Sequence, residues 1–301
     1  MSEEIRSDAL FTVGDDVYVW DDVVRLAQIR GDWEALAAQV RAGKAALEEL
    51  EGARPDDEEL DVAARRFRYE RDLLAADELD AWLERHQITS AEWEEYLQRV
   101  VACERIASRS ADLGVDAIEA EVWCEGICSG RLQELARELA ALAAVSPGRP
   151  IERLDPAFAE FCATAADPPS VAREVDLNRL EWLRFGYEAV VAEDDGAAYE
   201  AALCVRAEGE SLAAVADRSG LAMEQDECWL DELDPALATR FLAVTAGEVV
   251  GPVQVDGAFV VARITSRTSP SVDDPEVLAR ARASVVARAV DRIVTERVVW
   301  G

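Results

Sequence analysis

Histidine is almost missing from this chain of 301 residues, because His86 is the only one. A single imidazole excludes mechanisms and zinc sites that need two or more. His86 follows Trp82 and Leu83 at helical spacing. We therefore expect it at the solvated end of a helix and give it no catalytic role.

Positive charge and long apolar runs are also scarce. Against 31 Lys and Arg stand 62 Asp and Glu, which gives a formal net charge of −31 and a pI near 4.3. Such a chain repels nucleic acid and anionic membranes, so neither is an expected partner. No apolar run approaches the length of a bilayer span or of a signal-peptide core. The sequence therefore predicts a soluble, cytoplasmic protein.

Disulfide, metal and nucleotide signals are weak. Six cysteines are too few for a disulfide scaffold. Cys124 and Cys128 have a loose metal spacing with no histidine nearby, so we expect two buried thiols and no metal. Gly247 and Gly251 are not followed by the Lys-Ser/Thr pair of a phosphate loop, and no cofactor is expected.

Helical periodicity dominates the first half of the chain. Two short extended pieces around Gly14 predict a hairpin at the start, over residues 11–19. Apolar residues then recur at helical spacing, and Thr89 with Glu92 forms a capping box. The sequence predicts a helical domain over residues 1–145, with its acidic runs on the solvated face.

Prolines and a change of pattern divide the rest of the chain. A stretch poor in periodicity contains Pro147, Pro150, Pro156, Pro168 and Pro169. We expect a linker there, over residues 146–175. Residues 176–268 then read as mixed α and β, with a helix starting at Ser211 and a hairpin whose turn is Asp256-Gly257. The expected fold class is α+β, with a small antiparallel-rich sheet covered by helices.

The last segment, residues 269–301, carries the clearest helix signal. Asp274 can cap a helix whose first residue is Pro275. An apolar stripe follows at Leu278, Ala281, Val285, Ala289 and Ile293. Arginine outnumbers acid along this helix, so it would suit an apolar groove in an acidic region.

Several segments of the second half resemble parvulin-type peptidyl-prolyl isomerases. The motifs that carry the likeness are residues 210–220, 228–230, 233–241, 246–252 and 255–264. The segment Ala-Gly-Glu-Val-Val-Gly-Pro at 246–252 is the most specific of them. The resemblance covers residues 176–268 and implies a parvulin-like α/β domain there.

The first half resembles the helical chaperone region of SurA-type and PpiC-type proteins. Residues 13–19, 55–60 and 88–97 match its opening hairpin, an acidic helix and a later helix, in that order. In those proteins the C-terminal helix completes the chaperone region. The resemblance therefore implies that residues 269–301 pack back onto residues 1–145.

The departures from the parvulin pattern bear on activity. The family carries two active-site histidines, and this chain has Phe185 or Tyr187 at the first position and Phe259 at the second. We therefore assign no catalytic residue and expect a protein that is not an enzyme. The doubtful counterparts of the family's thiol or carboxylate are Cys228 and Asp226.

The resemblance also implies an apolar peptide groove. Its residues would be Trp229, Leu230, Leu237, Phe241 and Phe259. Apolar contact could hold a proline-containing peptide there. The same side chains could equally form core, and the sequence leaves both alternatives open.

Residues 201–206, 210–215 and 297–300 also resemble segments of peptide maturation system proteins, which are associated with ribosomally made, modified peptides. Our first hypothesis is a peptide-binding chaperone or escort. Its partners would be a peptide or unfolded polypeptide client, such as a precursor peptide, and the enzymes that modify that precursor. The alternatives are an isomerase that desolvates the X-Pro amide and a structural assembly subunit.

Overall fold

The computed structural model describes residues 9–50, 54–106 and 117–301, and the chain divides into two compact units. Unit 1 comprises Met1–Phe161 and Val290–Gly301, and unit 2 comprises Cys162–Ala289. Unit 1 is mainly helical, and unit 2 contains a four-stranded antiparallel sheet with helices. The predicted α+β fold class is confirmed.

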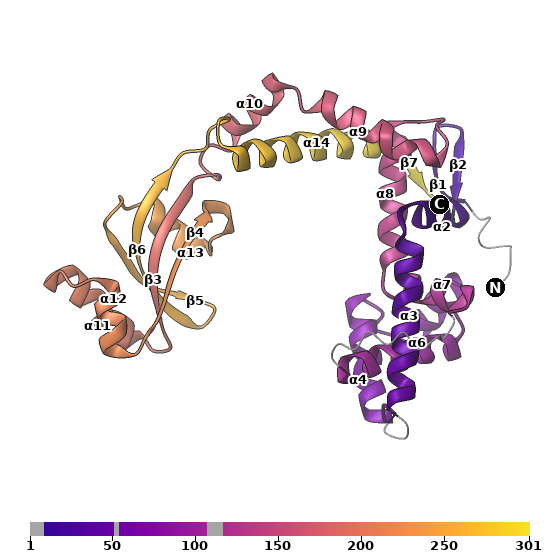
Figure 1. The fold of residues 1–301 in the computed structure, drawn as a ribbon, viewed down its shortest axis with the longest axis horizontal. Helices are drawn as coiled ribbons and strands as arrows, with labels where there is room; N and C mark the ends of the chain where they lie inside the picture. Colours follow the sequence, from indigo (N-terminus) through magenta and orange to yellow (C-terminus); the bar gives the residue numbers. More distant parts are fainter. Residues whose placement is uncertain (1–8, 51–53, 107–116) are drawn as a thin grey trace. The chain divides into compact units, whose positions relative to one another are not determined.

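Unit 1 consists of helices and one small sheet (Figure 1). Its elements are β1 (Ala9–Val13), β2 (Asp16–Val19), α2 (Trp20–Arg30), α3 (Asp32–Glu49), α4 (Asp57–Glu70), α5 (Ala76–Arg85), α6 (Ser90–Arg105), α7 (Glu119–Cys128), α8 (Arg131–Val145), η1 (Ile151–Arg153), most of α9 (Leu154–Ala165) and β7 (Val298–Trp300). The predicted hairpin is confirmed, because β1 pairs with β2. β7 pairs with the other edge of β1, which brings the end of the chain to its beginning.

Two helices of unit 1 begin at side-chain caps, Asp56 for α4 and Thr89 for α6, and α8 lies in the core of the unit. The Thr89 hydroxyl accepts a hydrogen bond from the Glu92 amide at 3.2 Å, so the predicted capping box is confirmed. Leu132, Leu135 and Leu139 on α8 are fully buried in the core of the unit. Burial of each such side chain contributes roughly 1.5–3 kcal/mol to folding.

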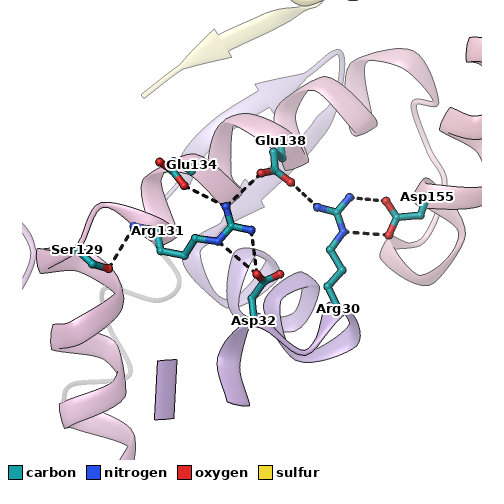
Figure 2. Close-up of polar contacts among 7 residues, drawn as sticks. All are labelled: Arg30, Asp32, Ser129, Arg131, Glu134, Glu138 and Asp155. Atoms are coloured by element: carbon teal, nitrogen blue, oxygen red, sulfur yellow. Dashed lines mark hydrogen bonds and ion pairs between the residues drawn. The ribbon is translucent and has the colours of Figure 1, made fainter. Parts of the chain in front are cut away.

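An ionic network joins elements of unit 1 that are distant in sequence (Figure 2). Arg131 contacts Asp32 at 2.9 Å and Glu138 at 3.5 Å. Glu138 also pairs with Arg30, whose Nε donates to Asp155 at 3.0 Å. The hydrogen bond from Arg30 lowers the pKa of the Asp155 carboxyl. The network thus joins the end of α2 to α8 and to the starts of α3 and α9.

Unit 2 is built on the sheet of four antiparallel strands in the order β4-β3-β6-β5. Its elements are α10 (Pro168–Leu177), β3 (Arg184–Ala192), α11 (Asp195–Leu203), the π-helical turn η2 (Cys204–Glu208), α12 (Leu212–Ser219), β4 (Ala222–Trp229), η3 (Leu230–Glu232), α13 (Pro235–Leu242), β5 (Val249–Val255), β6 (Ala258–Thr268) and most of α14 (Pro275–Arg297). The predicted hairpin is β5–β6, and Asp256 and Gly257 both have positive φ, as a type I′ turn requires.

Helices cover both faces of this sheet. On one face, α13 packs on a cluster that includes Phe185, Ala262 and Ile264. On the other face, α11 and α12 pack on a cluster that includes Val190 and Val261. Because side chains alternate along a strand, neighbouring residues of β6 belong to different clusters.

The segment predicted as a linker, residues 146–175, is largely helical. It contains η1, α9 and the start of α10. Pro168 and Pro169 lie in the first turn of α10, and the Asp167 side chain accepts from the Ser170 amide at 2.7 Å. Proline fits the first turn of a helix, where its missing N–H has no partner to lose. These prolines therefore start a helix, and the boundary between the units falls inside α9.

The C-terminal helix α14 contributes to both units. Its last turn belongs to unit 1, where Arg297 donates to the Ala144 carbonyl at 2.9 Å. The predicted return to the N-terminal region is therefore correct for this end. Its first turns pack instead within unit 2, where Val277 and Ala281 meet Val171 on α10. The prediction that the whole helix packs on residues 1–145 is wrong, because its buried residues are in these first turns.

A buried carboxylate holds α10 to α14 within unit 2. The Glu174 side chain is 2% exposed. It accepts hydrogen bonds from Ser284 Oγ at 2.7 Å, from Asn178 Nδ2 at 2.9 Å and from Arg288. A buried charge is tolerated only when it is paired and hydrogen-bonded in this way.

Candidate peptide-binding site

Helix α13 places an aromatic residue against the middle of the sheet in unit 2. Asp234 caps the helix by accepting from the Ala236 amide at 2.8 Å, and Pro235 opens it. Phe241 is fully buried, and its ring centroid lies 5.5 Å from Phe185 and 5.6 Å from Tyr187. Both contacts have the edge-to-face geometry that aromatic rings prefer.

The five predicted groove residues do not line one groove. Leu230, Leu237 and Phe241 belong to the cluster under α13. Phe259 packs in the cluster under α11 and α12, on the opposite face of the sheet. Trp229 packs in a third cluster with residues of α10 and α14. The sequence order alone could not assign these faces, because the register of β6 decides the face of Phe259.

Trp229 has a structural role in unit 2. Its ring lies between two guanidinium groups, with Arg184 Cζ at 4.6 Å and Arg280 Cζ at 5.0 Å from the ring centroid. Arg280 also lies 5.2 Å from the ring of Trp182 and forms an ion pair with Asp231 at 2.5 Å. These cation–π contacts join the end of β4 to α14. These contacts place Trp229 outside the candidate peptide-binding site.

The two positions that correspond to family histidines are separated by the sheet. Phe185 and Tyr187 both face α13, so either one could stand at the first position. Phe259 pairs with Ala192 and faces α11, whereas Tyr187 pairs with Ile264. Residues 162–289 contain no histidine.

Two ionisable groups, the Cys228 thiol and the Tyr187 hydroxyl, belong to residues that pack against the cluster of Phe241. Cys228 pairs with Phe185, and Asp226 pairs with Tyr187. Burial, with Asp226 and Glu232 nearby, raises the pKa of the Cys228 thiol to about 11. Burial, with Cys228 and Asp226 nearby, also raises the pKa of the Tyr187 hydroxyl. At neutral pH both groups are protonated, so neither is prepared to act as a nucleophile or base.

The pKa of Cys228 predicts slow alkylation. Only the thiolate reacts with iodoacetamide, so the rate at Cys228 should rise about tenfold per pH unit between pH 7 and 10. The alkylation rate should level off only above the thiol pKa of about 11, where the thiolate predominates. Mass spectrometry of digested protein separates Cys228 from the other five cysteines. Free N-acetylcysteine is the control, with a plateau near pH 9. A plateau near pH 9 at Cys228 as well would contradict the described environment.

Strand β4 carries strong negative charge at the edge of the sheet. Its residues from Ala222 to Glu227 are all exposed. Residues 224–234 contain no Arg or Lys and include Glu224, Asp226, Glu227, Asp231, Glu232 and Asp234. The strand itself could not be predicted from sequence, because four polar residues in succession from Glu224 lack the alternation typical of a strand. Together with the half-buried Tyr187 on the neighbouring strand, it forms the candidate site: an aromatic side chain with an acidic border.

Unit 1 contains hollows on its surface. One of about 400 Å³ lies where α5 is followed by α6 and is lined by residues such as Glu84, Ile88, Glu92, Trp123 and Cys124. A second, of about 430 Å³, lies between α4 and α6 and includes Val62 and Val101. Both offer apolar surface beside carboxylates, which suits side chains of a bound polypeptide.

His86 and the cysteine pair lie near the first hollow. His86 ends α5, where its Nδ1 lies 2.8 Å from the Trp82 carbonyl and burial lowers its pKa. It is half-buried rather than solvated, because its ring packs on Trp82 at 4.3 Å. Cys124 and Cys128 are buried thiols, as predicted, with their sulfurs 3.8 Å apart. Among residues 9–50, 54–106 and 117–301, no three His, Cys, Asp or Glu side chains are grouped to hold a metal ion.

Comparisons with known proteins give distant structural likenesses. No protein-family model and no curated protein matches the chain. The foldase PrsA of Streptococcus pneumoniae is 11% identical, with 96% of this chain and 92% of that chain covered and a TM-score of 0.35. The foldase PrsA of Lactococcus lactis is 10% identical, with 96% and 91% covered and a TM-score of 0.34. A SurA-like chaperone of Campylobacter jejuni is 9% identical, with 98% and 99% covered and a TM-score of 0.22.

The chain is thus similar in structure to PrsA foldases and SurA-like chaperones at low sequence identity. No helix in the described part of the chain is long and apolar enough to cross a bilayer.

Proposed function

We propose that this chain is a non-catalytic peptide-binding protein, a chaperone or escort whose binding site is the α13 face of unit 2. One observation carries the proposal. The half-buried ring of Tyr187, which packs on the buried Phe241, borders an exposed and strongly acidic edge strand. Apolar surface with a few polar groups at its border is the usual composition of a peptide or ligand site.

The chemistry of this face supports binding rather than catalysis. Unit 2 has no histidine, and the thiol of Cys228 and the hydroxyl of Tyr187 are both held in their neutral forms. The nearby carboxylates Glu224 and Asp226 are exposed. No group at the site thus combines a tuned pKa with a shielded position, as a general base normally does.

The proposed client is a precursor of a ribosomally made, modified peptide, which the protein would hold for its modifying enzymes. This part rests on the resemblance to peptide maturation system proteins. The acidic border favours clients that carry Lys or Arg. The same proposal assigns the protein to the cytoplasm, because six cysteines spread over 301 residues do not form a disulfide framework.

Two rival functions remain as alternatives. A peptidyl-prolyl isomerase could lower its barrier by desolvating the X-Pro amide at this face. An assembly subunit would use the helices of unit 1 and leave the α13 face unoccupied. Peptide binding at Tyr187 would argue against the assembly subunit. The absence of accelerated isomerisation would argue against the isomerase.

Calorimetric titration with an Arg-Pro-containing peptide tests the binding site. Replacing Tyr187 with Ala should weaken binding about tenfold, because an aromatic side chain that contacts a ligand commonly contributes more than 1 kcal/mol. Tyr199 is the matched control: it lies on α11 and is 63% exposed. Tyr199→Ala should bind as the unchanged protein does. Equal affinities for all three proteins would show that the peptide binds elsewhere.

A further inference from the structure

The outer edge of β4 has backbone groups that no strand of unit 2 satisfies. β4 is the last strand of the order β4-β3-β6-β5, and its only partner is β3. In an antiparallel pair, alternate residues direct their N–H and C=O groups away from the partner strand. On an exposed edge these groups are available to another extended chain.

Hydrogen bonds at the end of β4 identify which residues direct their backbone groups outward. The Glu227 amide donates to the Asp226 side chain at 2.8 Å, and the Trp229 amide donates to the Glu232 side chain at 3.4 Å. The Leu230 amide donates inward, to the Leu183 carbonyl at 2.9 Å. The backbone N–H and C=O groups of odd-numbered residues in β4 therefore point outward, and those of even-numbered residues point to β3.

The same bonds limit the length of edge that is open. The amides of Glu227 and Trp229 are occupied by side-chain carboxylates. The outward backbone groups of Met223 and Gln225 lie before this stretch. Every residue in that earlier part of β4 is exposed. The open edge therefore spans Ala222 to Asp226, which is long enough to pair with about five residues of a second chain.

Charge selects the kind of chain that can pair there. Glu224 and Asp226 point to the α13 face, because they occupy the same register as Cys228, which packs in that cluster. Opposite charges directly across a strand pair are favourable and like charges are unfavourable. A second copy of β4 would bring acid against acid, so pairing of two copies at this edge is disfavoured.

We infer that the outer edge of β4 binds an extended basic peptide as a fifth strand of the sheet, with its Lys or Arg side chains beside Glu224 and Asp226. This inference rests on the proposed function and specifies its client: backbone hydrogen bonds supply affinity, and alternate basic residues supply selectivity. Because β4 lies between the added strand and β3, the added side chains on the α13 face lie next to Glu224 and Asp226, one strand further out than Tyr187.

The first test uses the unchanged protein and three versions of one probe, the blocked hexapeptide Lys-Val-Lys-Val-Lys-Val with a fluorescent label. One version has unmodified amides, one is N-methylated at the lysines and one is N-methylated at the valines. Only alternate amides of an added strand face β4, so one methylated version should bind at least about tenfold more weakly and the other nearly as well as the parent. Equal anisotropy titrations for all three would overturn the inference.

The second test changes the edge. Gln225→Pro removes an outward N–H and leaves the bonds to β3 intact, a position where edge strands tolerate proline. Gln225→Ala is the matched control and should bind normally, whereas the proline variant should bind about tenfold more weakly. Equal thermal melting of the two variants shows that the sheet is retained. Normal binding by the proline variant would contradict the inference.

A charge exchange separates this site from general attraction to an acidic protein. The double variant Glu224→Lys with Asp226→Lys should lose the lysine probe and bind the matching Glu-Val hexapeptide. If it still prefers the lysine probe, the remaining negative charge of the molecule accounts for binding and the inference is wrong. Dimers of the unchanged protein that Gln225→Pro dissociates would instead assign the edge to a second copy.

The outcome also distinguishes this inference from the proposed function. If Tyr187→Ala weakens the Arg-Pro peptide while N-methylation has no effect, the α13 face binds peptide without strand pairing. If no peptide binds in either experiment, both proposals are wrong.

Discussion

Alanine in place of Phe241 should lower the unfolding free energy of unit 2 by about 3–5 kcal/mol, the usual cost of removing a buried phenylalanine ring. Phe241 is fully buried and contacts the rings of Phe185 and Tyr187. Typical domains are stable by only about 5–15 kcal/mol. Hydrogen exchange measured by mass spectrometry should show faster exchange in β3 and β6 and unchanged exchange in α8 of unit 1.

Phe259→Ala is the control for this prediction, because Phe259 is half-buried on the other face of the sheet. Partial burial predicts a smaller loss of about 1–2 kcal/mol. If the two variants lose the same stability, the assignment of these rings to different clusters is wrong.

The second large effect concerns the buried carboxylate of α10. Glu174→Ala should lower the unfolding free energy of unit 2 by about 2–3 kcal/mol, because hydrogen bonds to a charged group contribute about 1.5–3 kcal/mol each. Part of this loss is recovered, since the Arg288 side chain is 58% exposed and can be hydrated after the change. Urea denaturation measures the loss, and hydrogen exchange should locate it in α10 and the first turns of α14.

Asp176→Ala is the matched control, because it removes an acid from the exposed side of the same helix. It should leave stability unchanged within about 0.5 kcal/mol. A similar loss in both variants would mean that net charge, rather than the contacts of Glu174 with Ser284 and Arg288, sets the stability.

Local signals in the sequence predicted several elements correctly. The Asp256-Gly257 turn specified the β5–β6 hairpin, because both residues must adopt positive φ. Thr89 and Glu92 specified the start of α6 through their own hydrogen bonds. Such features depend on residues within a few positions of one another, so one sequence is sufficient to recognise them.

Features that depend on distant residues could not be predicted. Arg30 pairs with Asp155 and Arg131 with Asp32 (Figure 2), and no local pattern indicates either contact. Strand β4 was not predicted, because its exposed acidic residues do not alternate with apolar ones. The sequence did identify Cys228 and Asp226 as candidates, but only the pairing of β4 with β3 brings them beside Tyr187.

The structure places the apolar residues predicted for the groove in three different clusters. Leu230, Leu237 and Phe241 share a cluster, whereas Trp229 stacks on arginines and Phe259 faces the other helices. Apolar character alone predicts that a side chain is buried and leaves the face undetermined. The alternation along each strand, once its register is known, decides that question.

The central claim is that unit 2 binds peptides without catalysing their isomerisation, and exchange NMR spectroscopy of one Arg-Pro peptide tests both parts in a single sample. With the protein present, peptide resonances should shift or broaden on binding. Cis and trans signals should show no exchange cross-peaks at mixing times of about one second, since uncatalysed isomerisation takes tens to hundreds of seconds. Cross-peaks at a tenth of an equivalent of protein, absent with Tyr187→Ala, would contradict the claim and identify a histidine-free isomerase.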